Sequence, residues 1–317
     1  MSSNSAMSSS SDASSAGAGP DAGPGSGPGA GAEPDAGPGS GPGAGAGPGA
    51  GAWSEVVPGA GLDGVPEVLA PLAARYVDWL RLPAAATSDT SGEDPALVRA
   101  MPMVLRVERA EPPGRTPLLE AAASAAVAVC LDPRSAPGGE WYDEVSRWVG
   151  GRIRKVTRRA RGAHWAAVQQ LPGVTVAVRG DSGLAEVRAL VPGLVSESPR
   201  EVSRLQIAGT DLPPDEPGEP VPGLPVVWLN PAVELTVGKA AAQVGHATMI
   251  MAAALPAARL AQWRADGLRC AVRVATPQGW RAVLDAAAGG RSTVLVRDAG
   301  FTEVAPGTVT CAAHWPA

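Results

Sequence analysis

The sequence predicts an α/β fold in its last third, a small β-sheet with helices packed on it. Short apolar strands alternate with helical segments from Pro225 to Ala317. A proline-rich, acidic stretch over residues 210–224 precedes this region and is typical of a linker. Before it, residues 65–209 contain longer helical segments and one hairpin, which predicts a mostly helical α+β domain.

Residues 1–60 form a low-complexity tail. Up to Ala52 they are nearly all Ser, Gly, Ala and Pro, and the string DAGPGSGPGAGA occurs at 21–32 and again at 35–46. A segment with so few large apolar side chains buries too little surface to offset its conformational entropy. We therefore predict that the tail is disordered.

Apolar spacing locates the elements of residues 65–209. It predicts helices over 66–82, 116–131 and 140–171, the last interrupted by glycines. Strands over 174–178 and 185–190 predict a hairpin. The small residues of the helix over 116–131 would let another element approach it closely.

The elements after the linker follow a regular order. We expect strands over 225–229, 270–275, 293–297 and 308–313, and helices over 238–255, 256–265 and 277–288, the last capped by Thr276.

Composition and charge exclude several classes of protein. The formal net charge of −5 argues against a general polyanion binder, although four acidic residues lie before Ala52 in the tail, so a local basic site stays open. Three distant cysteines indicate buried thiols rather than a disulfide or zinc framework. No histidine spacing suggests a ligand set, so we expect no metal and no cofactor. The sequence has no secretory signal and no apolar run long enough for a membrane span, so a cytoplasmic protein is expected.

One candidate site lies at the start of the helix over 238–255. Lys239, Gln243 and His246 share a helix face. A helix N-terminus carries free N–H groups and partial positive charge, which suits a phosphate or a developing oxyanion. A solvated lysine at a helix start is the alternative.

A second candidate is Asp298, which follows a predicted strand in the segment RDAGFTEVAPGTVT, residues 297–310. Its carboxylate would lie where the strand passes into a loop, with threonine hydroxyls nearby. The residues alone leave open that it only caps a turn.

Two motifs together resemble a known family. VGKAAAQVGHA (237–247) and RDAGFTEVAPGTVTC (297–311) are similar to the GK-x-AAQ-x-x-HA and DAG-x-T-x-x-x-PG-T-x-T motifs of the second, archaeal and eukaryotic, type of peptidyl-tRNA hydrolase. The two motifs occur in the family's order.

The resemblance implies a small mixed sheet flanked by helices and an enzyme that cleaves the ester between a peptide and the 3′ ribose of tRNA, recycling the tRNA. It implies peptidyl-tRNA as the partner and four active-site residues at the motif positions, Lys239, Asp298, Thr302 and Thr310. We expect Gly238, Gln243, His246 and Gly300 to contribute to substrate binding, with His246 structural rather than catalytic.

A basic segment before the linker fits an RNA substrate. It contains six cations, Arg152, Arg154, Lys155, Arg158, Arg159 and Arg161, followed by Trp165. We interpret it as a helix that contacts phosphates, through Arg158 and Arg159 in particular, with Trp165 as a stacking platform. A solvated helix face is the alternative.

The sequence also departs from the family pattern. Leu235-Thr-Val precedes Gly238 where the family carries a further lysine, and CAAHWPA follows Thr310 in place of a glycine-rich loop. A catalytically inactive module that binds tRNA or another partner with the same fold therefore stays as an alternative. Whether the chain forms a homodimer is left open.

Overall fold

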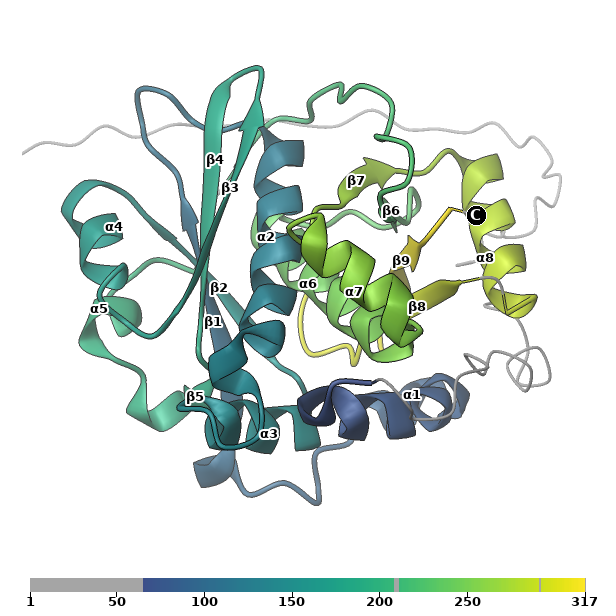
Figure 1. Ribbon diagram of the computed structural model, residues 1–317, viewed down its shortest axis with the longest axis horizontal. Helices are drawn as coiled ribbons and strands as arrows, with labels where there is room; N and C mark the ends of the chain where they lie inside the picture. The colour runs from purple at the N-terminus through teal and green to yellow at the C-terminus, as the bar shows by residue number, and fades with distance from the viewer. Residues whose placement is uncertain (1–64, 208–210, 291, 317) are drawn as a thin grey trace, which may run out of the picture. The chain divides into compact units, whose positions relative to one another are not determined.

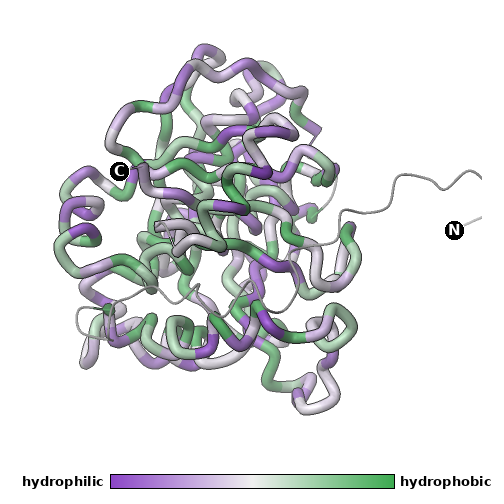
Figure 2. Tube along the Cα trace, turned by 90° about the vertical axis from the view of Figure 1, so that its right-hand side faces the viewer, coloured by the Kyte–Doolittle hydropathy of each residue, from purple (hydrophilic) through white to green (hydrophobic). Residues whose placement is uncertain are grey.

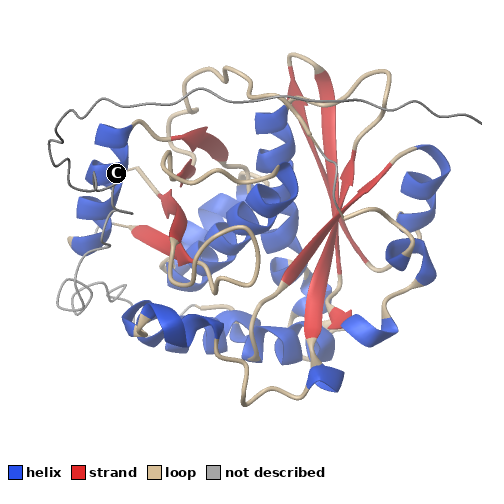
Figure 3. Ribbon diagram, turned by 180° about the vertical axis from the view of Figure 1, so that it is seen from behind, coloured by secondary structure: helices blue, strands red, loops and turns tan. Residues whose placement is uncertain are grey.

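The computed structural model describes residues 65–207, 211–290 and 292–316. The tail predicted over residues 1–60 lies outside the described residues. Two mixed β-sheets stand on either side of a layer of helices (Figures 1 and 3). The predicted α/β class and the mixed sheet flanked by helices are confirmed. Within the described residues, no helix is long and apolar enough to cross a membrane.

The first sheet belongs to residues 65–207, called the first half below. Its strands lie in the order β2-β1-β4-β3, with the short β5 paired to β1. β1 and β2 are parallel, whereas β4 is antiparallel to both of its neighbours. The strands are β1 (Arg99–Arg106), β2 (Lys155–Ala160), β3 (Gly173–Gly180), β4 (Gly183–Leu190) and β5 (Gly193–Leu194), and the helices are α1 (Ala70–Arg81), α2 (Arg115–Leu131), α3 (Tyr142–Gly150), α4 (Gly162–Val168) and α5 (Arg200–Ser203).

The second sheet belongs to residues 225–316, called the second half. Its strands lie in the order β7-β6-β9-β8, with β6 parallel to β7 and antiparallel to β9, which is also antiparallel to β8. The elements are β6 (Val226–Leu229), α6 (Val237–Ala254), α7 (Ala257–Ala265), β7 (Ala271–Val274), α8 (Pro277–Ala288), β8 (Thr293–Arg297) and β9 (Val309–His314). Each element predicted here is confirmed to within a residue or two, including the Thr276 cap, whose hydroxyl accepts from Gly279 N at 3.0 Å.

The two halves share one topology. In each, a first strand is followed by two helices, a parallel strand, a third helix and an antiparallel pair, and the first strand pairs with the parallel strand and with the last strand. The halves differ in the connection between the last two strands. Asp181 and Ser182 suffice in the first half, whereas residues 298–308 connect β8 to β9 in the second.

Helices α2 and α6 pack against each other between the sheets, through small residues (Figure 1). A side chain at Gly245 would place its Cβ 2.9 Å from Ala126 Cβ, so only glycine fits that crossing. The Thr248 hydroxyl donates to Ala123 O at 2.7 Å. When the two helices are aligned at their first residues, Gly245 corresponds to Ala123 and Thr248 to Ala126. The contact of Gly245 with Ala126 on one side thus corresponds to the contact of Ala123 with Thr248 on the other. An isologous interface between two equal subunits has the same symmetry.

Buried residues of both halves form one hydrophobic cluster. Figure 2 shows hydrophobic segments running through the middle of the molecule. The close approach expected of the helix over 116–131 is confirmed, because α6 packs on it. The division into domains at 210–224 stays a prediction.

The interpretation of the basic segment as a helix is wrong. Helix α3 ends at Gly150, and Lys155–Ala160 form strand β2. The parallel partner β1 supplies the backbone hydrogen bonds of this strand, which a charge pattern does not reveal.

Helix α1 of the first half covers the free edge of the second sheet. β8 is an edge strand, and the buried Tyr76 hydroxyl donates to Leu295 O at 3.1 Å and accepts from Leu295 N at 2.6 Å. One side chain thus satisfies both backbone groups that Leu295 presents at the free edge of the sheet.

We expect Tyr76→Phe to lower the free energy of unfolding by about 1–3 kcal/mol, because Leu295 N–H and C=O would be buried without partners. Chemical denaturation followed by circular dichroism measures this. Tyr142→Phe is the control, since that hydroxyl bonds Glu67 at the surface and should cost much less. Equal effects of both substitutions would contradict the assignment.

Candidate active site

The N-terminus of α6 carries the first functional side chain. The Thr236 hydroxyl caps the helix by accepting from Lys239 N at 3.2 Å. Lys239 Nζ lies 2.7 Å from Asp298 Oδ2 and donates to Thr302 Oγ1 at 3.1 Å. The ion pair is shielded, because the two side chains are only 11% and 8% exposed. The structure therefore brings Lys239, Asp298 and Thr302 together.

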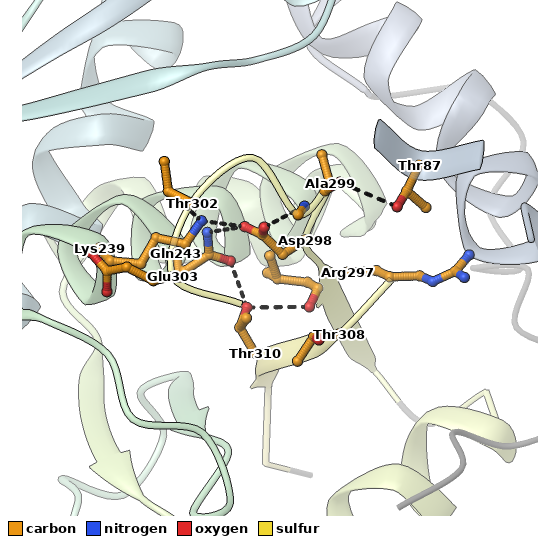
Figure 4. A network of polar contacts seen from close by, with 12 residues as sticks. Thr87, Lys239, Gln243, Arg297, Asp298, Ala299, Thr302, Glu303, Thr308 and Thr310 are labelled. Atoms are coloured by element: carbon orange, nitrogen blue, oxygen red, sulfur yellow. Dashed lines mark hydrogen bonds and ion pairs between the residues drawn. The ribbon is translucent and has the colours of Figure 1, made fainter. Parts of the chain in front are cut away.

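Asp298 lies directly after β8, at the start of the loop over 298–308, and its carboxylate is held by three donors (Figure 4). Lys239 Nζ and Gln243 Nε2 both donate to Oδ2, at 2.7 and 2.8 Å. Gly300 N donates to Oδ1 at 2.7 Å. An ionised carboxylate has about four acceptor positions. Among the described residues three are used, which leaves room for one more donor.

Gln243 and Thr310 continue this network into the core. The Thr310 hydroxyl donates to Gln243 Oε1 at 2.5 Å, which turns the amide nitrogen of Gln243 toward Asp298. Gln243 is 2% exposed and Thr310 is fully buried. Thr310 therefore reaches the carboxylate only through the Gln243 amide.

Two residues fix the loop over 298–308 above α6. Glu303 accepts from both the backbone N and the hydroxyl of Thr236, at 3.0 and 2.8 Å. Gly300 has φ +82°, and a Cβ there would lie 2.5 Å from Pro306 N. Glycine is thus required at 300 to bring its N–H to Asp298.

The first half also holds this loop. Trp79 Nε1 donates to Arg297 O at 3.0 Å, and the buried Thr87 hydroxyl lies 3.4 Å from Ala299 O (Figure 4). The Thr87 hydroxyl donates to Ala84 O at 2.7 Å. Asp298 is therefore flanked by one carbonyl that is hydrogen-bonded to the first half, at Arg297, and by one that contacts it, at Ala299.

Strand β2 lies against α6 on the side of the first half. Thr157 donates to Gly238 O at 2.7 Å, and a Cβ at Gly238 would lie 3.1 Å from that hydroxyl. Gly238 thus permits this close approach. Lys155 Nζ lies 3.0 Å from His246 Nδ1. His246 is therefore joined to Lys155, whereas Lys239 and Gln243 on the same helix reach Asp298.

Arg158 and Arg159 of this segment do not contact the Lys239–Asp298 cluster. Arg158 donates to the carbonyls of Ser203 and Leu205, and Arg159 bonds the Gln206 side chain. Trp165 is 7% exposed and belongs to a small separate core. The interpretation of Trp165 as a stacking platform is wrong, because its ring is buried.

A comparison with protein-family models bears on the segment that holds the Lys239–Asp298 cluster. Residues 225–317 match the family Peptidyl-tRNA hydrolase PTH2. The match covers residues 225–317, which contain both motifs, and confirms the family resemblance of this segment. The PTH2 family is a hydrolase family that acts on peptidyl-tRNA. No solved structure matches the chain significantly.

The first half repeats the topology of the PTH2 segment without these side chains. Pro117 and Ala121 of α2 stand at the positions of Lys239 and Gln243 when the two helices are aligned at their first residues. The Asp181-Ser182 turn replaces the loop that carries Asp298 and Thr302.

Sequence reasoning missed Glu303 and, although it named Lys155 in the basic segment, missed the pairing of Lys155 with His246. The positive φ of Glu303, +56°, is invisible in the sequence. Lys155 carried a usable signal, because it and Lys239 are the only two lysines of the chain.

The Lys155–His246 pair has shifted protonation equilibria. Burial lowers the pKa of Lys155 from 10.5 to about 7. Burial, and then the nearby Lys155 and Lys239, lower the pKa of His246 well below 6.5. Neutral His246 can accept at Nδ1, and Trp148 lies under Lys155 with its ring centroid 5.1 Å from Nζ.

We expect Lys155→Met to stabilise the protein most at and below about pH 7. Between pH 7 and 10.5 the unfolded chain binds a proton at Lys155 that the native state does not, so wild-type stability rises with pH through this window. The advantage of the variant should therefore shrink as pH rises toward 10. Denaturant midpoints from pH 6 to 10 measure it, with the exposed Arg147→Met as control. A difference in stability between variant and wild type that does not change with pH would contradict the lowered pKa of Lys155.

Proposed function

We propose that the protein is a peptidyl-tRNA hydrolase that cleaves the ester between a peptide and the tRNA 3′ ribose, releasing the peptide and free tRNA. The observation that carries the proposal is the shielded contact of Lys239 with Asp298 and Thr302 inside the segment that matches the PTH2 family. The substrate is peptidyl-tRNA, and neither a metal nor a cofactor takes part in the proposed reaction.

Asp298 has the role of positioning the attacking water. Its remaining acceptor position can bind a water proton, while Lys239, Gln243 and Gly300 keep the carboxylate from rotating. The water oxygen attacks the ester carbonyl carbon, and its proton passes to the carboxylate. Collapse of the tetrahedral intermediate breaks the bond to the ribose oxygen, which takes up the proton.

Lys239 has the role of stabilising the charge that develops on the carbonyl oxygen. An ammonium group has three donors, and Asp298 and Thr302 use two of them. The third can meet the oxyanion beside the partly positive start of α6. Thr302 is exposed and holds Nζ from the solvent side.

Thr310 and Gln243 act as positioning residues in this proposal. The buried hydroxyl of Thr310 fixes the orientation of the Gln243 amide, and the amide nitrogen fixes Asp298. Gly238 and Gly300 allow the close contacts around the site, and His246 connects α6 to Lys155. Direct substrate contacts of Gly238, Gly300, His246, Arg158 and Arg159 stay predictions.

The proposal is tested by release of tRNA from an N-acetyl-aminoacyl-tRNA by the full-length protein. We expect turnover in the wild type and a loss of about a hundredfold or more in kcat/KM for Lys239→Ala and for Asp298→Asn. The exposed residues Arg281 and Asp285 of α8 supply the charge-matched controls, Arg281→Ala and Asp285→Asn. Absence of turnover in the wild type would overturn the hydrolase and leave the inactive binding module.

The role of Thr310 is tested with two substitutions of different chemistry. Thr310→Val removes the hydroxyl at nearly constant volume, so Gln243 Oε1 loses its donor and the amide is held less firmly against Asp298. We expect kcat to fall about tenfold to a hundredfold, while Thr310→Ser keeps most of the activity. Unchanged kcat in Thr310→Val would show that the amide needs no such restraint.

A further inference from the structure

Phe301 is an unusual residue in the loop over 298–308. It is the only phenylalanine of the chain, and it is 46% exposed. Its neighbours in sequence are Gly300, which bonds Asp298, and Thr302, which bonds Lys239. A large aromatic ring is thus presented to solvent directly beside the proposed reacting groups, where packing of the core does not account for it.

Two arginines of the first half flank this ring. The guanidinium carbons of Arg152 and Arg154 lie 5.4 and 5.3 Å from the Phe301 ring centroid. Both distances are within the range of a cation–π contact. These residues belong to the connection between α3 and β2, outside the PTH2 segment.

The two guanidinium groups are held in place. Glu93 accepts from Arg152 Nε and from Arg154 Nη2, the latter at 2.6 Å, and Arg152 also donates to Thr87 O at 2.6 Å. Each arginine side chain keeps 23% of its surface exposed. Glu93 pairs with both guanidinium groups and the Asp89 carboxylate also attracts Arg152, yet both guanidinium groups stay partly exposed beside the ring.

A flat aromatic ring with fixed cations beside it suits nucleotides. Bases stack on aromatic rings and on guanidinium planes, and guanidinium groups donate to phosphate oxygens in pairs. The ester that the proposed reaction cleaves is on the terminal ribose of the tRNA. The last nucleotides must therefore lie next to Lys239 and Asp298, where Phe301 is found.

We propose that Phe301, Arg152 and Arg154 bind the 3′-terminal nucleotides of tRNA, with a base stacked on Phe301 and the arginines facing the sugar–phosphate backbone. This inference rests on the proposed function, because the position of the ester determines which nucleotides meet the ring. It gives the first half a direct part in substrate binding.

The test measures kinetics and tRNA affinity of the full-length protein. Phe301→Ala should raise KM for N-acetyl-aminoacyl-tRNA about tenfold, within the range for loss of one stacked base, and leave kcat within about twofold. Phe301→Trp should restore KM, because it retains a stacking surface. Leu184→Ala is the matched control, since Leu184 is 48% exposed on β4 of the other sheet.

A binding cycle separates this inference from the hydrolase itself. Affinities of wild type and Phe301→Ala are measured by fluorescence anisotropy for uncharged tRNA and for tRNA trimmed of its 3′-terminal nucleotides. If the ring meets those nucleotides, trimming should weaken the wild type about tenfold and leave Phe301→Ala nearly unchanged.

The outcomes are distinct. Turnover in the wild type with equal effects of trimming on both proteins would overturn the role of Phe301 alone. A coupled effect of trimming without turnover would overturn the hydrolase and support the nucleotide site. Absence of both tRNA binding and turnover would overturn both.

Discussion

The close packing of α2 on α6 is the contact on which the other features depend. Because Gly245 presents no side chain to Ala126, the two helices approach closely enough for Thr248 to bond the backbone at Ala123. This approach brings β2 against the first turns of α6. It thereby places Thr157 on Gly238 and Lys155 on His246. A site whose motif residues all come from the second half is therefore bounded on one side by the first half.

The polar groups of the site form a chain that runs from the core to solvent. It begins at the buried Thr310, passes through the Gln243 amide to Asp298, and ends at Lys239 and the exposed Thr302. Burial makes each link costly to leave unpaired, so the chain constrains its members strongly. The loop over 298–308 around this chain is held by the hydrogen bond between Glu303 and Thr236 and by the contacts of Trp79 and Thr87. Orientation of the carboxylate is thus a property of both halves.

The second half could be predicted well because its signals are local. Strand and helix periods, the Thr276 cap and two dense motifs all lie within short windows, and the structure follows them closely. The first half carried weaker signals. Strand β2 was interpreted as a helix because its charges suit either element and its pairing partner β1 lies far away in sequence. Tertiary contacts also determine which aromatic ring is exposed to solvent. Trp165 packs in a buried core, whereas Phe301 lies at the surface. Local patterns could not distinguish these two rings.

The shared topology of the two halves has a consequence for stoichiometry. Two identical subunits related by a two-fold axis would present two equal sites, and occupation of one could influence the other. Here the counterpart of Lys239 is Pro117, and a two-residue turn stands where the other half has the loop over 298–308. In a dimer of identical subunits, every substitution appears at both sites. In a single chain with two unlike halves, a substitution in one half leaves the other half unchanged. The described residues of the first half carry no such cluster at these positions, while its α3–β2 connection lies beside Phe301 of the other half. Among its described residues each chain therefore carries one Lys239–Asp298 cluster rather than two.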